Sequence, residues 1–263
     1  MGYGSAMDYL EVEEGREADG LRLVLTAGGP GPWSEAAKAV FHVKGLAWTP
    51  VRQNAGEANE ALARWTGQTS APVAVWMDEP PCTTTRSILW LAERLAPTPP
   101  LLPADGMLRA LCLGLCDELH AENGLGWSRR LMLLAPMMRA LGANAASTPI
   151  GSMALRYGFS EEATARAEGR VVEILELFSH QLASQAAAGR RYLVGDALSA
   201  VDLYWATFAA ICAPLPPDLC PMPEGLRDLY TVEEGPVADA LSPALLEHRD
   251  FVYREHLPLP LDF

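Results

Sequence analysis

Two segments of the sequence combine a predicted helix start with hydroxyl side chains. Pro32 suits the first position of a helix, because its missing N–H would have no partner there, and Ser34 follows two residues later. Thr84 and Thr85 open a second predicted helix. Backbone amides at a helix start attract negative charge. We therefore expect both segments to bind anionic groups.

Cys112, Cys116 and His120 recur every four residues along one predicted helix. Soft ligands on one helix face are able to bind a metal ion. Residues eight apart on a straight helix, however, are separated by about 12 Å of helical rise, and buried cysteines behave as small hydrophobic residues. We therefore predict a core position for these side chains and no metal site.

The elements that must position these residues change in kind at a proline-rich stretch, residues 96–106. Short apolar runs before it predict strands, at residues 21–25, 48–53 and 72–76. Helical spacing of apolar residues predicts helices, at residues 33–44, 57–65 and 84–95. This alternation is typical of a small α/β domain.

Almost everything after the proline-rich stretch has helical periodicity. The predicted helices are residues 107–123, 127–142, 161–188, 199–212 and 242–256. We therefore predict an acidic leader, an α/β domain, a proline-rich linker and an all-α domain. Their boundaries are residues 1–20, 21–96, 97–106 and 107–263.

Four motifs occur in an order and spacing typical of one family. They are GPWSEAAKAVFHVKGL from Gly31 to Leu46, Ala71-Pro72-Val73, TTRSI from Thr84, and GDALSAVD from Gly195. Together they resemble motifs of the glutathione transferase superfamily, over residues 21 to 212. The resemblance implies a thioredoxin-like first domain, in which Pro72 follows a cis peptide bond, and an all-helical second domain.

The resemblance also implies a glutathione site in the first domain. Its expected binding residues are Trp33, Gln68, Thr69, Ala71, Pro72, Thr84, Thr85 and Arg86. Thr85 stands where the family receives the γ-glutamyl carboxylate. Ala71 stands where the family's backbone pairs with the cysteinyl part of glutathione.

The sequence departs from the family at two of these places. Gly31 stands where the family has a catalytic Ser or Cys, and Thr84 replaces an acidic residue. Ser34 is the nearest hydroxyl and our candidate catalytic residue, with Thr26 as a second candidate. The alternative for Ser34 is a first-turn helix residue that bonds its own backbone.

Residues 117–130 are dense in polar groups, and the resemblance places them where the family lines its electrophile pocket. The candidate pocket residues are Glu118, His120, Trp127 and Arg130. The alternative is a solvated helix corner with arginine–carboxylate pairs. In the fourth motif, Ser199 and Asp202 have the spacing of a helix-capping pair, which we interpret as a folding signal.

Composition excludes several classes of protein. With 49% hydrophobic residues the chain is not disordered, and a net charge of −13 argues against nucleic acid or an anionic membrane as a partner. Its first residues lack a secretory signal pattern. Five cysteines, an odd number, indicate reduced thiols. We therefore expect a cytoplasmic protein.

The sequence predicts a glutathione-dependent transferase or reductase that acts on a small electrophile through the glutathione thiolate. Glutathione is the expected co-substrate, and the resemblance implies a homodimer. The alternative is a non-catalytic binding or regulatory protein of the same fold, favoured by Gly31 and Thr84. Because glutathione is itself anionic, the net charge of the chain would oppose its approach. Local features must therefore recognise it.

Overall fold

A computed structural model describes residues 7–263, except for the side chains of residues 143 and 146. The chain divides into two compact units. The first comprises the chain up to Leu101 together with Leu215–Glu224 and His256–Phe263. The second comprises Leu102–Pro214 and Gly225–Glu255.

The first unit is built around a sheet that has three strands within the described residues, in the order β2-β1-β3. These strands are β1 (Leu21–Thr26), β2 (Thr49–Gln53) and β3 (Val73–Trp76). β1 runs parallel to β2 and antiparallel to β3, with Val24 opposite both Val51 and Val73. The strand predictions are confirmed to within one residue at each end.

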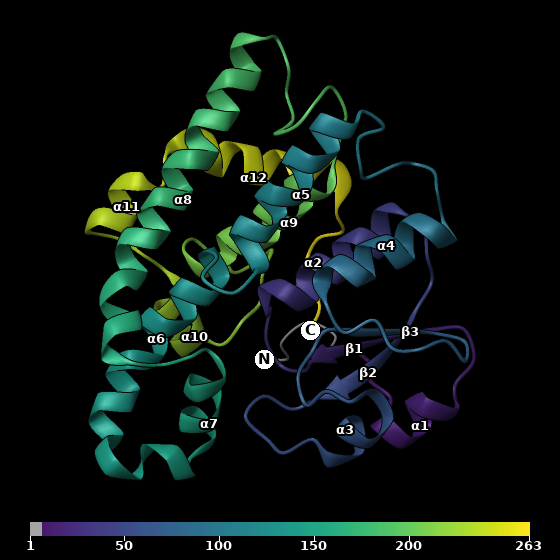
Figure 1. The fold of residues 1–263 in the computed structure, drawn as a ribbon, viewed down its shortest axis with the longest axis vertical. Coiled ribbons are helices and arrows are strands. Elements are labelled where there is room, and N and C mark those ends of the chain that lie inside the picture. The colour runs from purple at the N-terminus through teal and green to yellow at the C-terminus, as the bar shows by residue number, and fades with distance from the viewer. Residues whose placement is uncertain (1–6) are drawn as a thin grey trace. The chain divides into compact units, whose positions relative to one another are not determined.

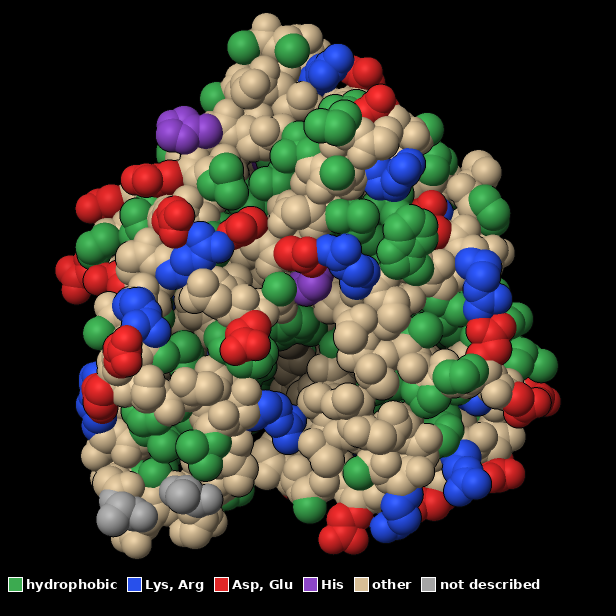
Figure 2. Space-filling view, viewed as in Figure 1, with side chains coloured by type: hydrophobic (Ala, Val, Ile, Leu, Met, Phe, Trp, Pro, Cys, Tyr) green, Lys and Arg blue, Asp and Glu red, His purple; other side chains and the backbone are tan. Residues whose placement is uncertain are grey.

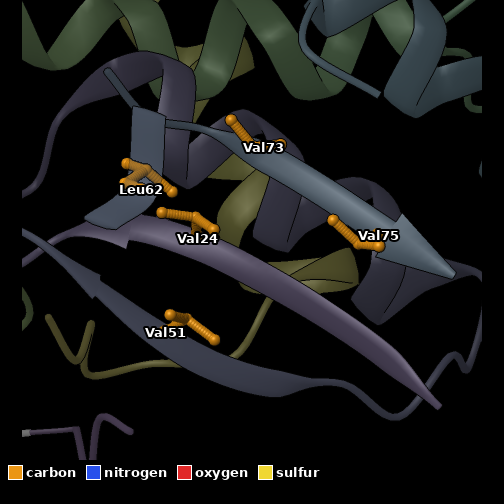
Figure 3. Close-up of a cluster of buried hydrophobic side chains, with 5 residues drawn as sticks. All are labelled: Val24, Val51, Leu62, Val73 and Val75. Carbon is orange, nitrogen blue, oxygen red and sulfur yellow. The ribbon is translucent and has the colours of Figure 1, made fainter. Parts of the chain in front are cut away.

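Helices cover both faces of this sheet. They are α1 (Val12–Glu17), α2 (Pro32–Val43), α3 (Glu60–Thr66) and α4 (Thr85–Leu95). α2 packs beside α4, and α1 beside α3 on the opposite face (Figure 1). One core cluster joins the α3 side chain Leu62 to valines of all three strands, and each of these side chains is at most 3% exposed (Figure 3).

The acidic segment near the start of the chain belongs to this sheet structure. Leu10 forms a parallel bridge with Val51, and the Arg52 guanidinium lies over the Tyr9 ring at 5.0 Å. α1 approaches β2 through Gly15, where an added Cβ would come within 2.5 Å of Val51. Only glycine therefore permits this close packing.

The second unit is helical. Its elements are α5 (Gly106–His120), α6 (Leu125–Leu141), η1 (Gly142–Ser147), α7 (Pro149–Arg156), α8 (Glu161–Ala187), α9 (Ala200–Phe208), η2 (Ala209–Ile211), α10 (Glu224–Tyr230), α11 (Pro236–Ala240) and α12 (Pro243–His256). α9 is buried along its whole length and packs against α5, while α8 packs against α6. The five helices predicted from periodicity are confirmed, whereas the short helices α7, α10 and α11 were not predicted.

Charge is distributed over one face of the protein. On the face shown in Figure 2, acidic and basic side chains are interspersed, so the net charge of −13 does not gather there into one patch. No helix within residues 7–263 combines the length and hydrophobicity needed to cross a bilayer.

Candidate functional site

The start of α2 places the Ser34 hydroxyl next to the end of β1. Pro32 is the first residue of the helix and Gly31 is its N-cap, which offers no side chain to cap the amides. Ser34 is 3% exposed, and its Oγ accepts a hydrogen bond from the Thr26 N–H at 3.4 Å. A Cβ built on Gly31 would lie 3.9 Å from Ser34 Oγ. The serine hydroxyl therefore borders the space that a side chain at position 31 would fill.

A buried glutamine connects this helix start to the segment before β3. Thr26 Oγ1 donates to Gln53 Oε1 at 2.7 Å, and Gln53 Nε2 donates to the carbonyls of Asn54 and Thr69 at 2.9 and 3.2 Å. The two candidate hydroxyls, Ser34 and Thr26, thus lie in one network with Thr69. Sequence analysis missed Gln53, although a polar residue that closes a strand was a signal for it.

The expected cis peptide bond between Ala71 and Pro72 is confirmed. Pro72 is buried, while Gln68, Thr69 and Ala71 are partly exposed. β3 begins directly after this segment and pairs with β1. The structure therefore places this part of the expected glutathione site beside the strand that leads to α2.

The start of α4 is capped by its own side chains. Thr84 Oγ1 accepts from the Ser87 N–H at 3.0 Å, and the Thr84 N–H donates to Ser87 Oγ at 3.1 Å. Thr84 is therefore engaged in holding the helix start. Thr85 is buried and Arg86 is exposed. The T-x-x-S spacing was a signal for this capping pair that sequence analysis did not use.

An ion cluster that is buried at Glu35 and exposed at Asp262 follows Ser34 within one helical turn. Lys38 Nζ lies 3.1 Å from Glu35 Oε1 and 3.0 Å from Asp262 Oδ1. Burial raises the pKa of the Glu35 carboxyl, although Lys38 opposes that rise. Burial raises the pKa of Tyr9 to about 12, and the nearby charges of Glu35 and Asp262 add to the rise. Lys38 therefore forms ion pairs with the two carboxylates near the start of α2, those of Glu35 and Asp262.

The candidate pocket residues of the helical unit separate into two groups. Glu118 pairs with Arg170 of α8. His120 Nε2 lies 3.3 Å from Asp117 Oδ1, and its ring meets the Tyr204 ring edge-on at 5.7 Å. The Glu118 contact is an arginine–carboxylate pair of the kind expected at a solvated helix corner.

Trp127 and Arg130 instead come together with two tyrosines from distant parts of the chain. The Trp127 ring meets the Tyr157 ring edge-on at 4.9 Å, and Arg130 Nη2 donates to Tyr230 Oη at 2.7 Å. Tyr157 follows α7 and Tyr230 ends α10. Neither tyrosine was predicted as a site residue, because the apolar pattern did not predict α7 or α10.

The fourth motif is structural, as interpreted from the sequence. Asp202 has no exposed surface. Its carboxylate accepts from the Ser199 N–H at 2.9 Å and the Leu193 N–H at 2.8 Å, and it lies 2.9 Å from His248 Nε2. This network caps α9 and ties it to the preceding loop and to α12.

The cysteines on α5 are buried. Cys112 and Cys116 are 0% and 2% exposed, and all five cysteines of the chain are free thiols. Within residues 7–263, no group of three or more His, Cys, Asp or Glu side chains is placed to hold a metal ion.

Comparison with known proteins adds a family match and several structural likenesses. Residues 138–230 match the family model of the glutathione S-transferase C-terminal domain. A search of curated proteins finds no match.

Three solved glutathione transferases are similar over nearly the whole chain. One is from Methylobacterium radiotolerans, in complex with glutathione sulfonate, at 18% identity, 89% of this chain, 91% of that chain and a TM-score of 0.55. Another is from Methylobacillus flagellatus, with glutathione bound. It is 13% identical, covers 90% of this chain and 99% of that chain, and has a TM-score of 0.61. The third is rice GST1, in complex with glutathione. It is 18% identical, covers 93% of this chain and 93% of that chain, and has a TM-score of 0.58.

These likenesses confirm the predicted fold, a thioredoxin-like domain followed by a helical domain. The family match covers part of the helical domain, from the last turn of α6 to the end of α10. The match identifies residues 138–230 as similar to a glutathione S-transferase C-terminal domain, and the solved structures show that the chain has the fold of these enzymes.

Proposed function

We propose that the protein binds glutathione on its thioredoxin-like unit and uses the glutathione thiolate to attack a small electrophile. The observation that carries this proposal is the Gln53 network, which joins the α2 start to Thr69 in the segment before β3. Solved proteins of the same fold hold glutathione or glutathione sulfonate.

Two parts of the tripeptide, the γ-glutamyl end and the central cysteine, have a binding group in this proposal. The backbone of Ala71 pairs with the cysteinyl part, and the partly exposed side chains of Trp33, Gln68 and Thr69 surround it. The start of α4, with Thr84, Thr85 and Arg86, receives the γ-glutamyl carboxylate, because helix starts favour anions. These local groups overcome the unfavourable net charge of −13.

The start of α2 activates the thiol. A free thiol has a pKa of about 8.5, and lowering it by about two units requires roughly 2.7 kcal/mol of preferential thiolate stabilisation. The uncapped amides beside Gly31 supply part of this. The Ser34 hydroxyl accepts from Thr26 and keeps its own proton to donate to the sulfur across the space left by Gly31.

The chemical step is a nucleophilic displacement or addition. With an aryl halide, the glutathione sulfur forms a bond to the ring carbon, the carbon–halogen bond breaks and halide leaves. The thiol proton passes to solvent when the thiolate forms. The protein supplies binding and thiolate stabilisation, and needs no metal for this step.

Three substitutions test the roles. Thr85→Ala is expected to weaken glutathione binding in calorimetry, with Thr85→Ser as the control that restores it. Ser34→Ala is expected to lower the conjugation rate with 1-chloro-2,4-dinitrobenzene more than it lowers binding. Gly31→Ser is expected to raise that rate, because Gly31 has an ordinary φ of −67° that serine accepts.

The second candidate is a non-catalytic protein that binds glutathione. The burial of Ser34 and the missing side chain at Gly31 favour it. Binding without turnover supports this candidate, and absence of binding at millimolar glutathione rejects both.

Two further properties belong to the proposal. We propose a cytoplasmic homodimer, consistent with the free thiols. Sedimentation of the purified protein tests the dimer.

A further inference from the structure

Arg130 carries a positive charge without an acidic partner. Its guanidinium bonds to the hydroxyls of Tyr230 and Tyr157, and it lies over the Tyr230 ring, 5.3 Å from the centroid. Across residues 7–263, no Asp or Glu forms an ion pair with it. A buried cation normally requires a counter-charge, because removing an ion from water is costly.

The neighbouring tyrosine does not supply that counter-charge. Burial raises the pKa of Tyr157, so this phenol stays neutral near pH 7. Burial opposes the charge of Arg130, while its hydrogen bonds to Tyr230 and Tyr157, and the negative charge of these phenols when they are ionised, raise the pKa of Arg130. The positive charge of Arg130 therefore lies beside aromatic side chains, and no acidic side chain of residues 7–263 pairs with it.

Other arginines of the same unit are held differently. Arg170 pairs with Glu118 and with Glu173. Arg129, the residue before Arg130, donates to the Ile211 and Leu229 carbonyls at 3.0 and 3.3 Å, and carbonyls near helix ends carry negative partial charge. Arg130 has neither kind of compensation.

One donor of Arg130 is also unused. Its Nε is buried and has no hydrogen-bond partner among the described residues, while the side chain as a whole is partly exposed. A buried donor without a partner costs about 1–3 kcal/mol. A carboxylate is the usual partner of a guanidinium, so a carboxylate ligand at the exposed part of the side chain would compensate its charge.

We propose that Arg130, Tyr157 and Tyr230 form a subsite for a carboxylate, and that Trp127 provides an aromatic wall beside it. This inference rests on the proposed function for its biological meaning: the electrophile conjugated to glutathione carries a carboxylate. Arg130 supplies charge and the hydrogen-bonding fork, and the Tyr230 hydroxyl accepts from Arg130 and has its own proton to donate. The edge-on Trp127–Tyr157 pair suits an aromatic acid.

The binding test uses benzoate and benzamide as probes, which differ in charge but hardly in shape. Calorimetry with the full chain is expected to give a benzoate Kd at least about tenfold below that of benzamide. Arg130→Gln is expected to weaken benzoate binding about 30-fold, equivalent to about 2 kcal/mol, and to leave benzamide unchanged. Arg139→Gln is the matched control, because Arg139 lies on the same helix and pairs with Glu161 at the surface.

The catalytic test uses glutathione with ethacrynate and with its methyl ester. In both, the thiolate sulfur bonds to the terminal alkene carbon, and water protonates the adjacent carbon. Wild-type kcat/KM is expected to favour ethacrynate, and Arg130→Gln is expected to remove that preference while the ester rate changes less than threefold.

The outcomes separate the two proposals. If wild-type protein turns over neither electrophile yet prefers benzoate, the subsite stands and the proposed function fails. Turnover of both electrophiles without a preference for benzoate overturns the subsite alone. If Arg130→Gln fails to fold, Arg130→Lys and Tyr230→Phe test the subsite in its place. Lysine is expected to retain most of the benzoate preference, Tyr230→Phe is expected to weaken benzoate selectively, and equal loss for both probes overturns the subsite.

Discussion

Asp202 and Arg130 are two charged residues of the helical unit, the first buried and the second partly exposed, and their surroundings differ. Asp202 accepts hydrogen bonds from Ser199 and Leu193 and faces His248. Arg130 bonds to a tyrosine hydroxyl and leaves its Nε without a partner. A saturated charge indicates a structural role, whereas an unsaturated one indicates a ligand. Stability measurements can test this distinction, because a saturated charge stabilises the fold and an unsaturated one does not.

The largest loss is expected for Asp202→Ala. Removing this carboxylate leaves the amides of Leu193 and Ser199 buried without acceptors and His248 without its partner. A buried donor left without its acceptor typically costs about 1–3 kcal/mol, and this substitution leaves both amides in that state. Urea unfolding followed by circular dichroism measures the change. A loss below about 1 kcal/mol would contradict the structural role.

A smaller loss is expected for Arg129→Met. Arg129 is 6% exposed and bonds to two carbonyls, which this substitution leaves without donors. Unsatisfied buried acceptors cost about 1–3 kcal/mol. The same unfolding experiment distinguishes this saturated arginine from its neighbour. Equal free energies of unfolding for wild type and Arg129→Met would contradict the expected difference between Arg129 and Arg130.

About 1 kcal/mol is expected for Thr84→Ala, as for a typical N-cap. Thr84 and Ser87 share the reciprocal capping arrangement of Ser199 and Asp202, but at an exposed position. Comparing Thr84→Ala with Asp202→Ala therefore separates the effect of burial on stability from the effect of the capping arrangement. If Thr84→Ala costs as much as Asp202→Ala, burial is not what makes Asp202 critical.

The smallest change is expected for Arg130→Met. Because the arginine lacks a counter-charge, an apolar side chain of similar length is expected to keep the free energy of unfolding within about 1 kcal/mol of wild type, or to raise it. Thermal and urea unfolding both check this. A large loss would show that Arg130 stabilises the fold and would remove its contrast with Asp202.

Local sequence patterns predicted most of the fold. Alternation in the first unit and long apolar stripes in the second placed β1 to β3 and α5, α6, α8, α9 and α12 close to their observed ends. These signals are local, because hydrophobic periodicity depends on residues within a few turns. The short helices α7, α10 and α11 escaped prediction because a stripe needs more than two turns to be recognised.

The candidate sites were less predictable than the fold. Arg130 stood out as a polar residue, but its partners Tyr157 and Tyr230 are 27 and 100 residues away. Ser34 was identified from a helix-start pattern, while its burial and its link through Thr26 to Gln53 required the packed strands.

The sequence by itself determined the order of the two domains, the helix starts and the capping pair at Ser199 and Asp202, because each depends on neighbouring residues. Only the tertiary structure decided which polar groups find partners. Glu118 of α5 pairs with Arg170 of α8. Arg130 bonds to tyrosine, and no acidic side chain among residues 7–263 pairs with it. Hydrogen-bond and charge satisfaction are set by residues distant in the chain, and no local pattern encodes them.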